Sequence, residues 1–388
     1  MKSKKLKVAV FTGSRAEYGL LFWLMRDIDA DKDMKLYVIA SGMHLSHEFG
    51  DTYSKIEEDG FKIDEKVEIL LSSNTPIGIL KSMGLGLIGY SESFTRIKPD
   101  LIIILGDRFE ALAAAQSAML LRIPILHLHG GEITEGAYDD SIRHAITKLS
   151  YLHATSTEEY RKRVIQLGES PNRVKYVGAI GLDAIKKMKF LNRKELTKSL
   201  NFDCNCPYFL ITFHPTTLDS RNDSVAFSNL LSALDSFKEF NLIFTYPNAD
   251  DGGRKIIERI KDYSIKNSDR AFSVPSMGQL NYLSALKHAS LVIGNSSSGI
   301  IEAPSFKIPS VNIGVRQKGR LSARSVYHSS IHLKDIKNAI NSSLKLDQNS
   351  KNFKNPYELN NTSRNIINMI KKSDLKSSKS FYSISNLD

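Results

Sequence analysis

The chain has very little cysteine and no long apolar run. Its 388 residues include only two cysteines, Cys204 and Cys206. A C-x-C pair without a second pair does not suit a structural zinc site, and we expect two free thiols. Glycine or charge interrupts every apolar stretch before it could span a membrane, so no membrane partner is expected. The basic start Met1–Lys5 precedes an apolar run too short for a signal peptide, which predicts a cytoplasmic protein.

Positive charge is in excess but is not concentrated in one compact element. The formal net charge is +11. Much of the excess lies near the two ends of the chain, including Lys351, Lys354, Lys371, Lys372, Lys376 and Lys379. No basic helix with interleaved aromatic residues appears, so nucleic acid is not expected as a partner. The excess instead favours a surface that steers a small anionic molecule toward the protein.

Strands that are almost wholly apolar alternate with amphipathic helices along the chain. This pattern predicts parallel sheets covered by helices on both faces, and the length suits two such domains. The lysine-rich stretch Leu182–Asp203 marks the expected boundary. The strands expected before it are Lys7–Thr12, Met34–Ala40, Leu101–Leu105, Ile123–Leu128, Leu152–Thr155 and Lys175–Val177. Those expected after it are Tyr208–Phe213, Asn241–Tyr246, Phe272–Val274, Leu291–Ile293 and Ser310–Ile313.

One glycine motif does not indicate a dinucleotide site. Gly84–Gly89 satisfies the G-x-G-x-x-G pattern. A dinucleotide fingerprint follows a strand and opens a helix, whereas here a helical stretch precedes the motif. We therefore expect a helix with close packing and no nicotinamide cofactor.

The stretch Leu291–Glu302 predicts a strand that turns into a helix through small hydroxyl residues. Backbone N–H groups and the positive end of the helix dipole then converge on one spot, which suits a phosphate. Ser296 and Ser297 lie in this turn, and Glu302 falls further along, within reach of a sugar edge. An ordinary serine N-cap is the alternative interpretation.

Polar residues gather at the carboxyl ends of the other predicted strands. They are Arg15, Asp107, Arg108, His129, Glu132, His214, Asn248, Arg316 and Arg320. Taken singly, each could be a helix cap or a core histidine, and Asp139 or Asp140 could simply cap the helix from Ser141. Because ligands of open α/β sheets bind at the carboxyl ends of strands, the set together favours a binding site in the cleft between two domains.

The chain resembles the hydrolysing UDP-N-acetylglucosamine 2-epimerases of sialic-acid biosynthesis. The matching segments, in family order, are Thr12–Tyr18, Ser41–His44, Gly106–Arg108, His129–Glu132, Asp139–Lys148, Phe213–Pro215, Gly294–Gly299 and Arg316–Arg320. The resemblance implies a GT-B fold, with two Rossmann-like doubly wound domains and the active site in the cleft between them. It implies an N-terminal domain over 1–185 with the catalytic carboxylates and a nucleotide-binding domain over 186–360. Residues 361–388 would form a helix that crosses back toward the first domain, plus a loose tail.

The family reaction eliminates UDP across C1–C2 to give a glycal, which water then converts to free N-acetylmannosamine. By this resemblance, Asp107, Glu132, Asp139 and His214 are the catalytic residues. Which carboxylate removes the C2 proton stays open, although carboxylates in one closed site can have separated pKa values. The residues implied to bind the nucleotide sugar are Arg15, Arg108, His214, Asn248, Ser296, Ser297, Glu302 and Arg316. No metal and no cofactor is implied, and the partners are a UDP-sugar substrate, the UDP product and a homodimer or homotetramer.

Three alternatives remain open at this point. The first is a sister epimerase that acts on UDP- or GDP-linked N,N′-diacetylbacillosamine in legionaminic-acid synthesis. The second is a GT-B glycosyltransferase, and the third is a non-catalytic anion binder. Relatives carry Glu at the position where this chain has His129. If that Glu is catalytic in the relatives, its role passes here to His129 or Glu132. Otherwise the position is not essential.

Overall fold

The computed structural model describes residues 5–71, 73, 75–134, 138–216, 220–247, 253–275, 277–347 and 351–384. The chain divides into two compact units. The first consists of Met1–Glu132, Asp139–Ala184 and Leu359–Asp388, and the second of Ile133–Tyr138 and Ile185–Glu358.

The first unit is built on a seven-stranded parallel sheet in the order β3-β2-β1-β4-β5-β6-β7. Its strands are β1 (Leu6–Thr12), β2 (Met34–Ser41), β3 (Ile63–Val67), β4 (Leu101–Leu105), β5 (Ile125–Leu128), β6 (Leu152–Thr155) and β7 (Val174–Tyr176). Its helices are α1 (Arg15–Asp29), α2 (Tyr53–Glu58), α3 (Pro76–Ile97), α4 (Phe109–Leu120), α5 (Asp139–Leu149), α6 (Glu158–Gln166) and α14 (Thr362–Lys372). Helix α7 (Leu182–Lys187) begins in this unit and ends in the second.

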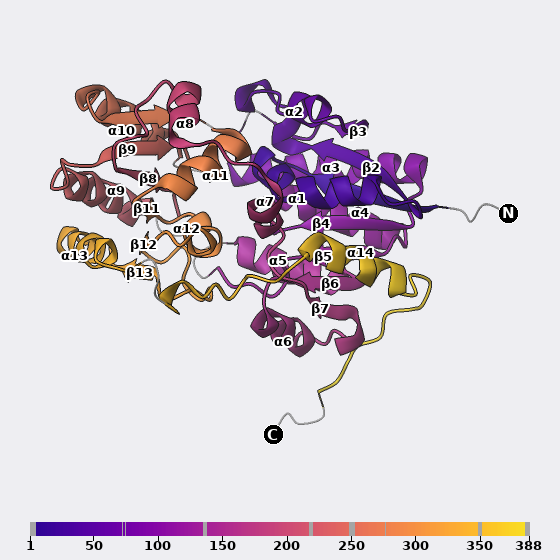
Figure 1. The fold of residues 1–388 in the computed structure, drawn as a ribbon. Coiled ribbons are helices and arrows are strands. Elements are labelled where there is room, and N and C mark those ends of the chain that lie inside the picture. The colour runs from indigo at the N-terminus through magenta and orange to yellow at the C-terminus, as the bar shows by residue number, and fades with distance from the viewer. Residues whose placement is uncertain are drawn as a thin grey trace. The chain divides into compact units, whose positions relative to one another are not determined.

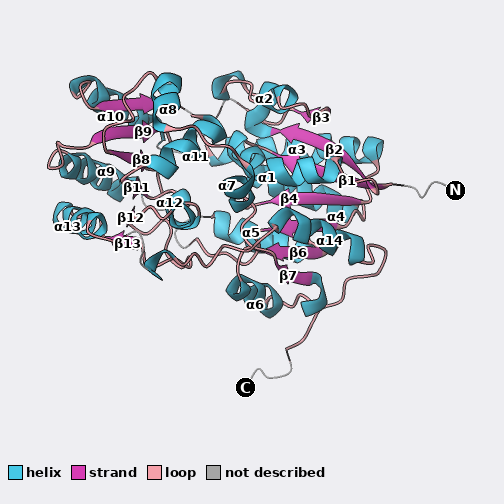
Figure 2. Cartoon of the chain, viewed as in Figure 1, coloured by secondary structure: helices cyan, strands magenta, loops and turns pink. Residues whose placement is uncertain are grey.

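Alternate residues of the central strand β1 face two different cores. Val8 and Val10 pack with the buried face of α1 and with α14. Ala9 and Phe11 pack on the opposite face with α3, α4 and α5. Figure 2 shows the helices of the unit around its strands. The two-sided covering explains why strands such as Leu101–Leu105 are apolar at every position.

The second unit repeats the plan with a six-stranded parallel sheet in the order β10-β9-β8-β11-β12-β13. Its strands are β8 (Tyr208–Thr212), β9 (Asn241–Thr245), β10 (Ala271–Val274), β11 (Leu291–Gly294), β12 (Ser310–Ile313) and β13 (Val326–Ser329). Its helices are α8 (Arg193–Leu200), α9 (Ser220–Leu234), α10 (Gly253–Lys266), α11 (Gly278–His288), α12 (Ser298–Ile301) and α13 (Leu333–Leu344). Both sheets reverse their strand order beside the first strand of the unit, and ligands of such folds bind there.

Helix α14 packs against α1 of the first unit, although the 174 residues Ile185–Glu358 of the second unit come between Ala184 and Leu359 in sequence (Figure 1). Two contacts connect the described part of the tail after it, which was expected to be loosely held, to the loop at Gly168 and Glu169. Lys379 forms an ion pair with buried Glu169 at 2.9 Å, and the Tyr382 N–H donates to the Gly168 carbonyl at 2.9 Å. The tail lies close over Gly168, where any side chain would collide with the Phe381 ring.

No helix in the described ranges is long and apolar enough to cross a membrane. Both cysteines are free, with Cys204 buried and Cys206 exposed.

Candidate functional site

The first unit gathers carboxylates around one buried arginine. Arg143, on α5, is 1% exposed and forms an ion pair with Asp107, in the loop after β4. Its other terminal nitrogen donates to the Glu132 carbonyl at 2.8 Å and to Asp140 Oδ1 at 3.3 Å. The structure therefore connects the loops after β4 and β5 to the first turn of α5 through a single guanidinium, whose planar fork suits such multiple contacts.

His129 and Glu132 form a second, more enclosed group. The Ile180 N–H donates to His129 Nε2 at 3.2 Å, so the ring proton lies on Nδ1, which is 3.0 Å from Glu132 Oε1. The same Glu132 oxygen accepts from Ser156 Oγ at 2.7 Å, and Glu132 is only 2% exposed. His129 adopts a positive φ of 64°, which is uncommon outside glycine. These contacts fix the tautomer and orientation of His129 and direct the Glu132 carboxylate into the protein.

Two glutamates that the sequence analysis did not select are buried near Asp107 and Arg108. Glu17 on α1 is 8% exposed and accepts from the Gly13 N–H at 2.7 Å. Glu110 on α4 is 1% exposed and accepts from Arg108 Nε at 2.7 Å. Burial, followed by the charge of Glu110, raises the pKa of Glu17 from 4.5 to about 8. Glu17 is therefore mainly protonated at neutral pH.

The remaining predicted residues of the first unit lie where strands turn into helices. Arg15 is the first residue of α1, Asp139 is the first residue of α5, and both are half-buried. Arg108 is the N-cap residue of α4. Asp107, Arg108, Glu132 and Asp139 thus belong to neighbouring loops at one edge of the sheet, whereas Lys148, further along α5, pairs with Glu169 instead.

In the second unit, a two-point amide contact holds the predicted phosphate loop against His214. Asn295 Oδ1 accepts from the His214 N–H, and Asn295 Nδ2 donates to the His214 carbonyl, both at 2.7 Å. Asn295 is 1% exposed. The preceding Gly294 has a φ of +136°, and a Cβ there would lie 1.9 Å from the Thr212 carbonyl oxygen. Only glycine permits this close approach of β11 to β8.

Arg316 and Gln317 extend from the loop after β12 to the same point. Arg316 Nη1 donates to the Asn295 carbonyl at 3.1 Å, and Gln317 Nε2 donates to it at 2.8 Å. Burial, followed by the charge of Arg316, holds the pKa of His214 well below its usual value. His214 is therefore neutral at neutral pH in the protein without ligand.

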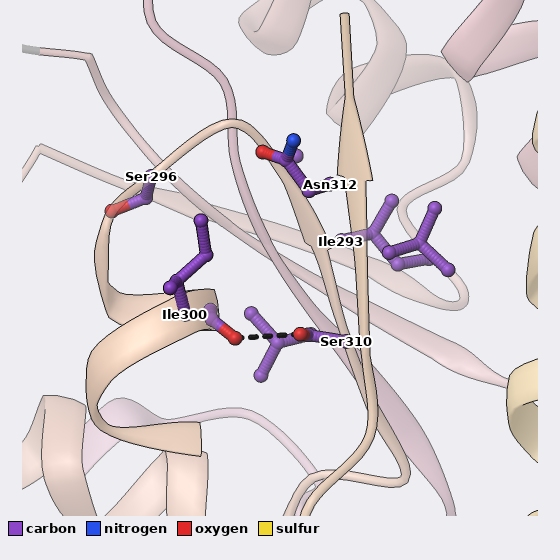
Figure 3. Close-up of a pocket in the computed structure, with 9 residues that line it drawn as sticks. Ile293, Ser296, Ile300, Ser310 and Asn312 are labelled. Atoms are coloured by element: carbon purple, nitrogen blue, oxygen red, sulfur yellow. Dashed lines mark hydrogen bonds between the residues drawn. The ribbon is translucent and has the colours of Figure 1, made fainter. Parts of the chain in front are cut away.

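Ser296 and Ser297 lie at the exposed side of this loop, both half-buried. The helix that follows, α12, has four residues, and Glu302 is its C-cap. Figure 3 shows Ser296 above a small pocket between α12 and the strands β11 and β12, where Ser310 Oγ donates to the Gly299 carbonyl at 2.5 Å. At about 10 Å³ this pocket holds one water molecule at most, so it is not a substrate site.

Of the two remaining predicted residues of the second unit, the structure describes Glu302 but not Asn248. Glu302 lies close enough to Tyr282 for its charge to raise the pKa of that phenol, after the larger effect of burial. Asn248 lies outside the described residues. Within those residues, no cluster of three or more His, Cys, Asp or Glu side chains could hold a metal ion.

One pattern in the sequence could have identified Glu17 in advance. Glu17, Leu21, Leu24 and Ile28 recur at helical spacing, and all four are buried on the same face of α1. An acidic residue on the buried face of an amphipathic helix needs a partner or a proton. Glu110 carries no comparable signal, because only the fold shows how deeply α4 buries it. Arg143 lies in the Asp139–Lys148 motif, and a role in orienting Asp139 was one expectation for it.

Comparison with known proteins places the whole chain among nucleotide-sugar epimerases. The family model described as UDP-N-acetylglucosamine 2-epimerase matches residues 26–371. A Campylobacter jejuni protein named GDP/UDP-N,N′-diacetylbacillosamine 2-epimerase (hydrolyzing) is 47% identical over 84% of this chain and 85% of its own length. The Escherichia coli polysialic acid biosynthesis protein P7 is 38% identical over 97% of each chain.

The fold comparison agrees with this match. A crystal structure of UDP-GlcNAc 2-epimerase from Neisseria meningitidis bound to UDP-GlcNAc superimposes with a TM-score of 0.81. It covers 95% of this chain and all of that one at 17% sequence identity. The expected GT-B architecture of two Rossmann-like units is confirmed.

Proposed function

The chain belongs to the UDP-N-acetylglucosamine 2-epimerase family, and from this premise we propose that it is a hydrolysing 2-epimerase for a nucleotide-linked diacetamido sugar of the N,N′-diacetylbacillosamine type. The observation that carries the choice of substrate is the 47% identity to the Campylobacter jejuni enzyme of that name. UDP-N-acetylglucosamine, our first expectation from the sequence, becomes the second candidate. The polysialic acid protein, 38% identical over nearly the whole chain, favours it. The family match gives no support to a glycosyltransferase.

The proposed reaction has two stages. A base of the first unit removes the C2 proton of the sugar while the bond from C1 to the diphosphate oxygen breaks, which leaves a C1=C2 double bond and the free nucleoside diphosphate. Water then adds its oxygen to C1, and a proton returns to C2 on the opposite face. The products are the nucleoside diphosphate and the free 2-epimeric sugar.

We assign the proton transfers to Asp107 and Asp139, which lie on neighbouring loops of the first unit. Arg143 orients Asp107 through their ion pair, and its contact with Asp140 holds the turn that carries Asp139. Glu132, whose carboxylate faces Ser156 and His129, acts in this proposal through His129. A ring held in one tautomer by two hydrogen bonds can present a fixed surface to the sugar.

The second unit supplies the groups for the nucleotide. Ser296 and Ser297 of the Asn295 loop are proposed to bind the diphosphate together with Arg316, which donates to the Asn295 carbonyl. For Arg15 and Arg108 of the first unit, binding of the nucleotide sugar stays a prediction from the sequence. Glu302 is proposed to accept from the ribose hydroxyls, and Asn248 is retained for the nucleotide sugar from the sequence. His214, neutral in the free protein, gains a proton most easily when a diphosphate lies beside it, and can then assist the leaving group.

A substrate panel tests this proposal. The purified protein is incubated with UDP-N-acetylglucosamine, UDP-N,N′-diacetylbacillosamine and its GDP counterpart, and release of nucleoside diphosphate and of free sugar is measured for each. The diacetamido substrates should give kcat/KM values at least about tenfold above that of UDP-N-acetylglucosamine, since a site built for a polar group discriminates against its absence. Turnover of UDP-N-acetylglucosamine alone would favour the second candidate, and no turnover of any of the three would refute the proposal.

A further inference from the structure

The chain continues beyond α14 as a tail, of which residues 373–384 are described (Figure 1). This segment contains no helix or strand, but side chains of the first unit bind its main chain. The Tyr151 hydroxyl donates to the Asp374 carbonyl at 2.6 Å, and Arg173 Nη2 donates to the Ser378 carbonyl at 2.8 Å. The described part of the tail therefore follows the surface of the first unit.

Lys379 of this tail lies at the carboxyl end of α5. Its ammonium group donates to the Lys148 carbonyl and to the Ser150 carbonyl, both at 2.7 Å. Helix α5 ends at Leu149, and a helix cannot pair its last carbonyl groups internally. The helix dipole also favours a cation at this end. Lys379 therefore caps α5 at its carboxyl end.

The third contact of Lys379 neutralises a buried carboxylate. Glu169 is 1% exposed and accepts from Lys379 at 2.9 Å, from Lys148 at 2.6 Å and from His153 Nε2 at 3.1 Å. Burial alone would raise the pKa of Glu169, but the hydrogen bonds from His153 and the two lysines lower it to about 2. The carboxylate is therefore ionised at neutral pH, and it needs its cations because an unpaired buried charge is costly. Since Lys148 belongs to the last turn of α5, both lysines connect Glu169 to the end of this helix.

Polar contacts hold the tail beyond Leu375 more than apolar packing does. Leu375 packs against the core that contains residues of α1 and α14. Farther along, Phe381 is 71% exposed, Tyr382 38% and Ile384 36%. Side chains this exposed bury little apolar surface, so they contribute little to the docking of the tail. Lys379, with its three polar contacts, is therefore the main anchor of this part of the chain.

The opposite end of α5 carries residues of the candidate site. Asp139 begins the helix, and Arg143, one turn later, forms the ion pair with Asp107. Because a helix rises about 1.5 Å per residue, Lys379 contacts α5 about 15 Å from Asp139 along the helix axis. A packed helix is a rigid element that transmits a shift of one end to the other. A change at Lys379 can therefore move Asp139 and Arg143.

From these contacts we propose that Lys379 is a positioning residue, which holds α5 at its carboxyl end and thereby fixes Asp139 and Arg143 at the amino end. Lys379 acts through the helix and does not touch the sugar. A small misplacement of reacting groups by a distant change can lower a rate by about 100-fold, so the effect on turnover is measurable. That effect rests on the proposed function, whereas the effect on α5 does not.

Lys379→Met tests the proposal in the full-length protein, because methionine has a similar length and no charge. Hydrogen exchange of the α5 amides should accelerate at least about tenfold, since opening of the last helical turn no longer breaks the contacts with Lys379. With the most active substrate of the panel, kcat should fall by about 10- to 100-fold. The dissociation constant of UDP should stay unchanged, because the proposed diphosphate site belongs to the second unit.

Two further variants separate positioning from a general loss of stability. Lys376→Met, at an exposed position of the same tail, is the matched control and should change neither the exchange of α5 nor kcat. Lys379→Arg keeps a cation that can donate to both carbonyls and to Glu169, and it should restore most of the wild-type kcat.

Unchanged exchange of α5 in Lys379→Met would overturn the proposal. So would a folded Lys379→Met variant with faster exchange and the kcat of the wild type, because the end of α5 would then not position the reacting groups. A wild type that turns over none of the three substrates refutes the proposed function instead, and the exchange of α5 then decides whether Lys379 holds this helix.

Discussion

At the scale of single residues, a few buried polar side chains set the geometry of each candidate site. Asn295 holds the main chain of His214 at both its N–H and its carbonyl, and its own carbonyl accepts from Arg316 and Gln317. Arg143 plays the corresponding part in the first unit, with contacts to Asp107, Asp140 and the Glu132 carbonyl. In each unit, one buried side chain fixes the loops that carry the proposed ligand-binding residues. That buried side chain need not touch the ligand itself.

Asn295→Asp tests the amide contact with a side chain of the same shape. The carboxylate can still accept from the His214 N–H, but its second oxygen faces the His214 carbonyl and cannot donate. We expect the free energy of unfolding to fall by about 1–3 kcal/mol and UDP affinity to fall with it. Denaturant unfolding and calorimetry measure the two effects. Asn338→Asp, an exposed change of the same charge on α13, should alter neither, and equal effects at both positions would refute the role of Asn295.

Glu17 predicts a pH-dependent loss of stability. Its pKa is raised from 4.5 to about 8, so the unfolded chain releases this proton more readily than the folded one. The folded state therefore loses stability as pH rises from about 5 to about 8, and the lost stability stays constant above that range. Glu17→Gln removes this titrating carboxyl. The free energy of unfolding of the variant, relative to that of the wild type, should therefore increase over the same pH range.

Urea unfolding at pH 5, 6, 7 and 8 checks this expectation. Glu239→Gln, at an exposed position, is the control and should show no trend relative to wild type. A difference between Glu17→Gln and wild type that stays constant from pH 5 to pH 8 would show that Glu17 titrates normally.

Substitutions of Asp107 and of Arg316 should have different effects, the first on turnover and the second on nucleotide binding. Asp107→Asn should lower kcat by at least about 100-fold, the usual contribution of an acid–base group, while UDP affinity stays largely intact. Ser297→Ala and Arg316→Ala should mainly weaken UDP binding. Turnover assays and UDP titrations of the folded variants compare the two groups. Near-normal turnover in Asp107→Asn would remove it from the acid–base role, and unchanged UDP affinity in both other variants would misplace the nucleotide site.

At the scale of elements, Asp183 of α7 binds the start of α14 and so holds this helix in the first unit. Asp183 Oδ1 accepts from the Thr362 N–H at 3.1 Å, and Oδ2 accepts from the Ser363 N–H at 2.8 Å and from its hydroxyl. These N–H groups begin α14, whose own N-cap, Asn361, makes no side-chain capping bond. A carboxylate from another helix therefore caps this helix, which favours its positive end.

Asp183→Ala should release the start of α14. Loss of the cap leaves buried N–H groups unpaired, and we expect the free energy of unfolding to fall by about 2 kcal/mol. Hydrogen exchange of the α14 amides should accelerate more than exchange in β1. Asp269→Ala, at an exposed aspartate, is the control. Unchanged exchange in α14 would show that packing against α1 alone holds it.

The elements that could be predicted from the sequence are those with a strong apolar signal. All eleven expected strands occur, with ends shifted by a residue or two, because buried parallel strands are apolar throughout. The strands β3 and β13 were missed. Both are edge strands, β3 contains three charged residues in Ile63–Val67, and neither forms an apolar run. The ion pair between Lys379 of the tail and buried Glu169 could not be predicted, because the two residues are distant in sequence.

At the scale of the whole molecule, the proposed proton transfers belong to the first unit and the proposed diphosphate site to the second. The sequence motifs selected polar residues at strand ends, where α/β proteins bind ligands, and their roles in the site stay predictions. They could not reveal that Glu132 faces inward, that Asn295 holds His214, or that Glu17 and Glu110 are buried together. Those facts depend on contacts between segments that only the folded chain brings together.

The most direct measurement of the central claim is turnover of a diacetamido nucleotide sugar in heavy water, followed by NMR of the released sugar. Elimination and hydration require the C2 proton to leave and a solvent deuteron to replace it. We predict free sugar of inverted C2 configuration carrying one deuterium at C2, in equal amount to the nucleoside diphosphate released. Nucleoside diphosphate released together with a sugar that keeps its C2 hydrogen and its original configuration would contradict the account.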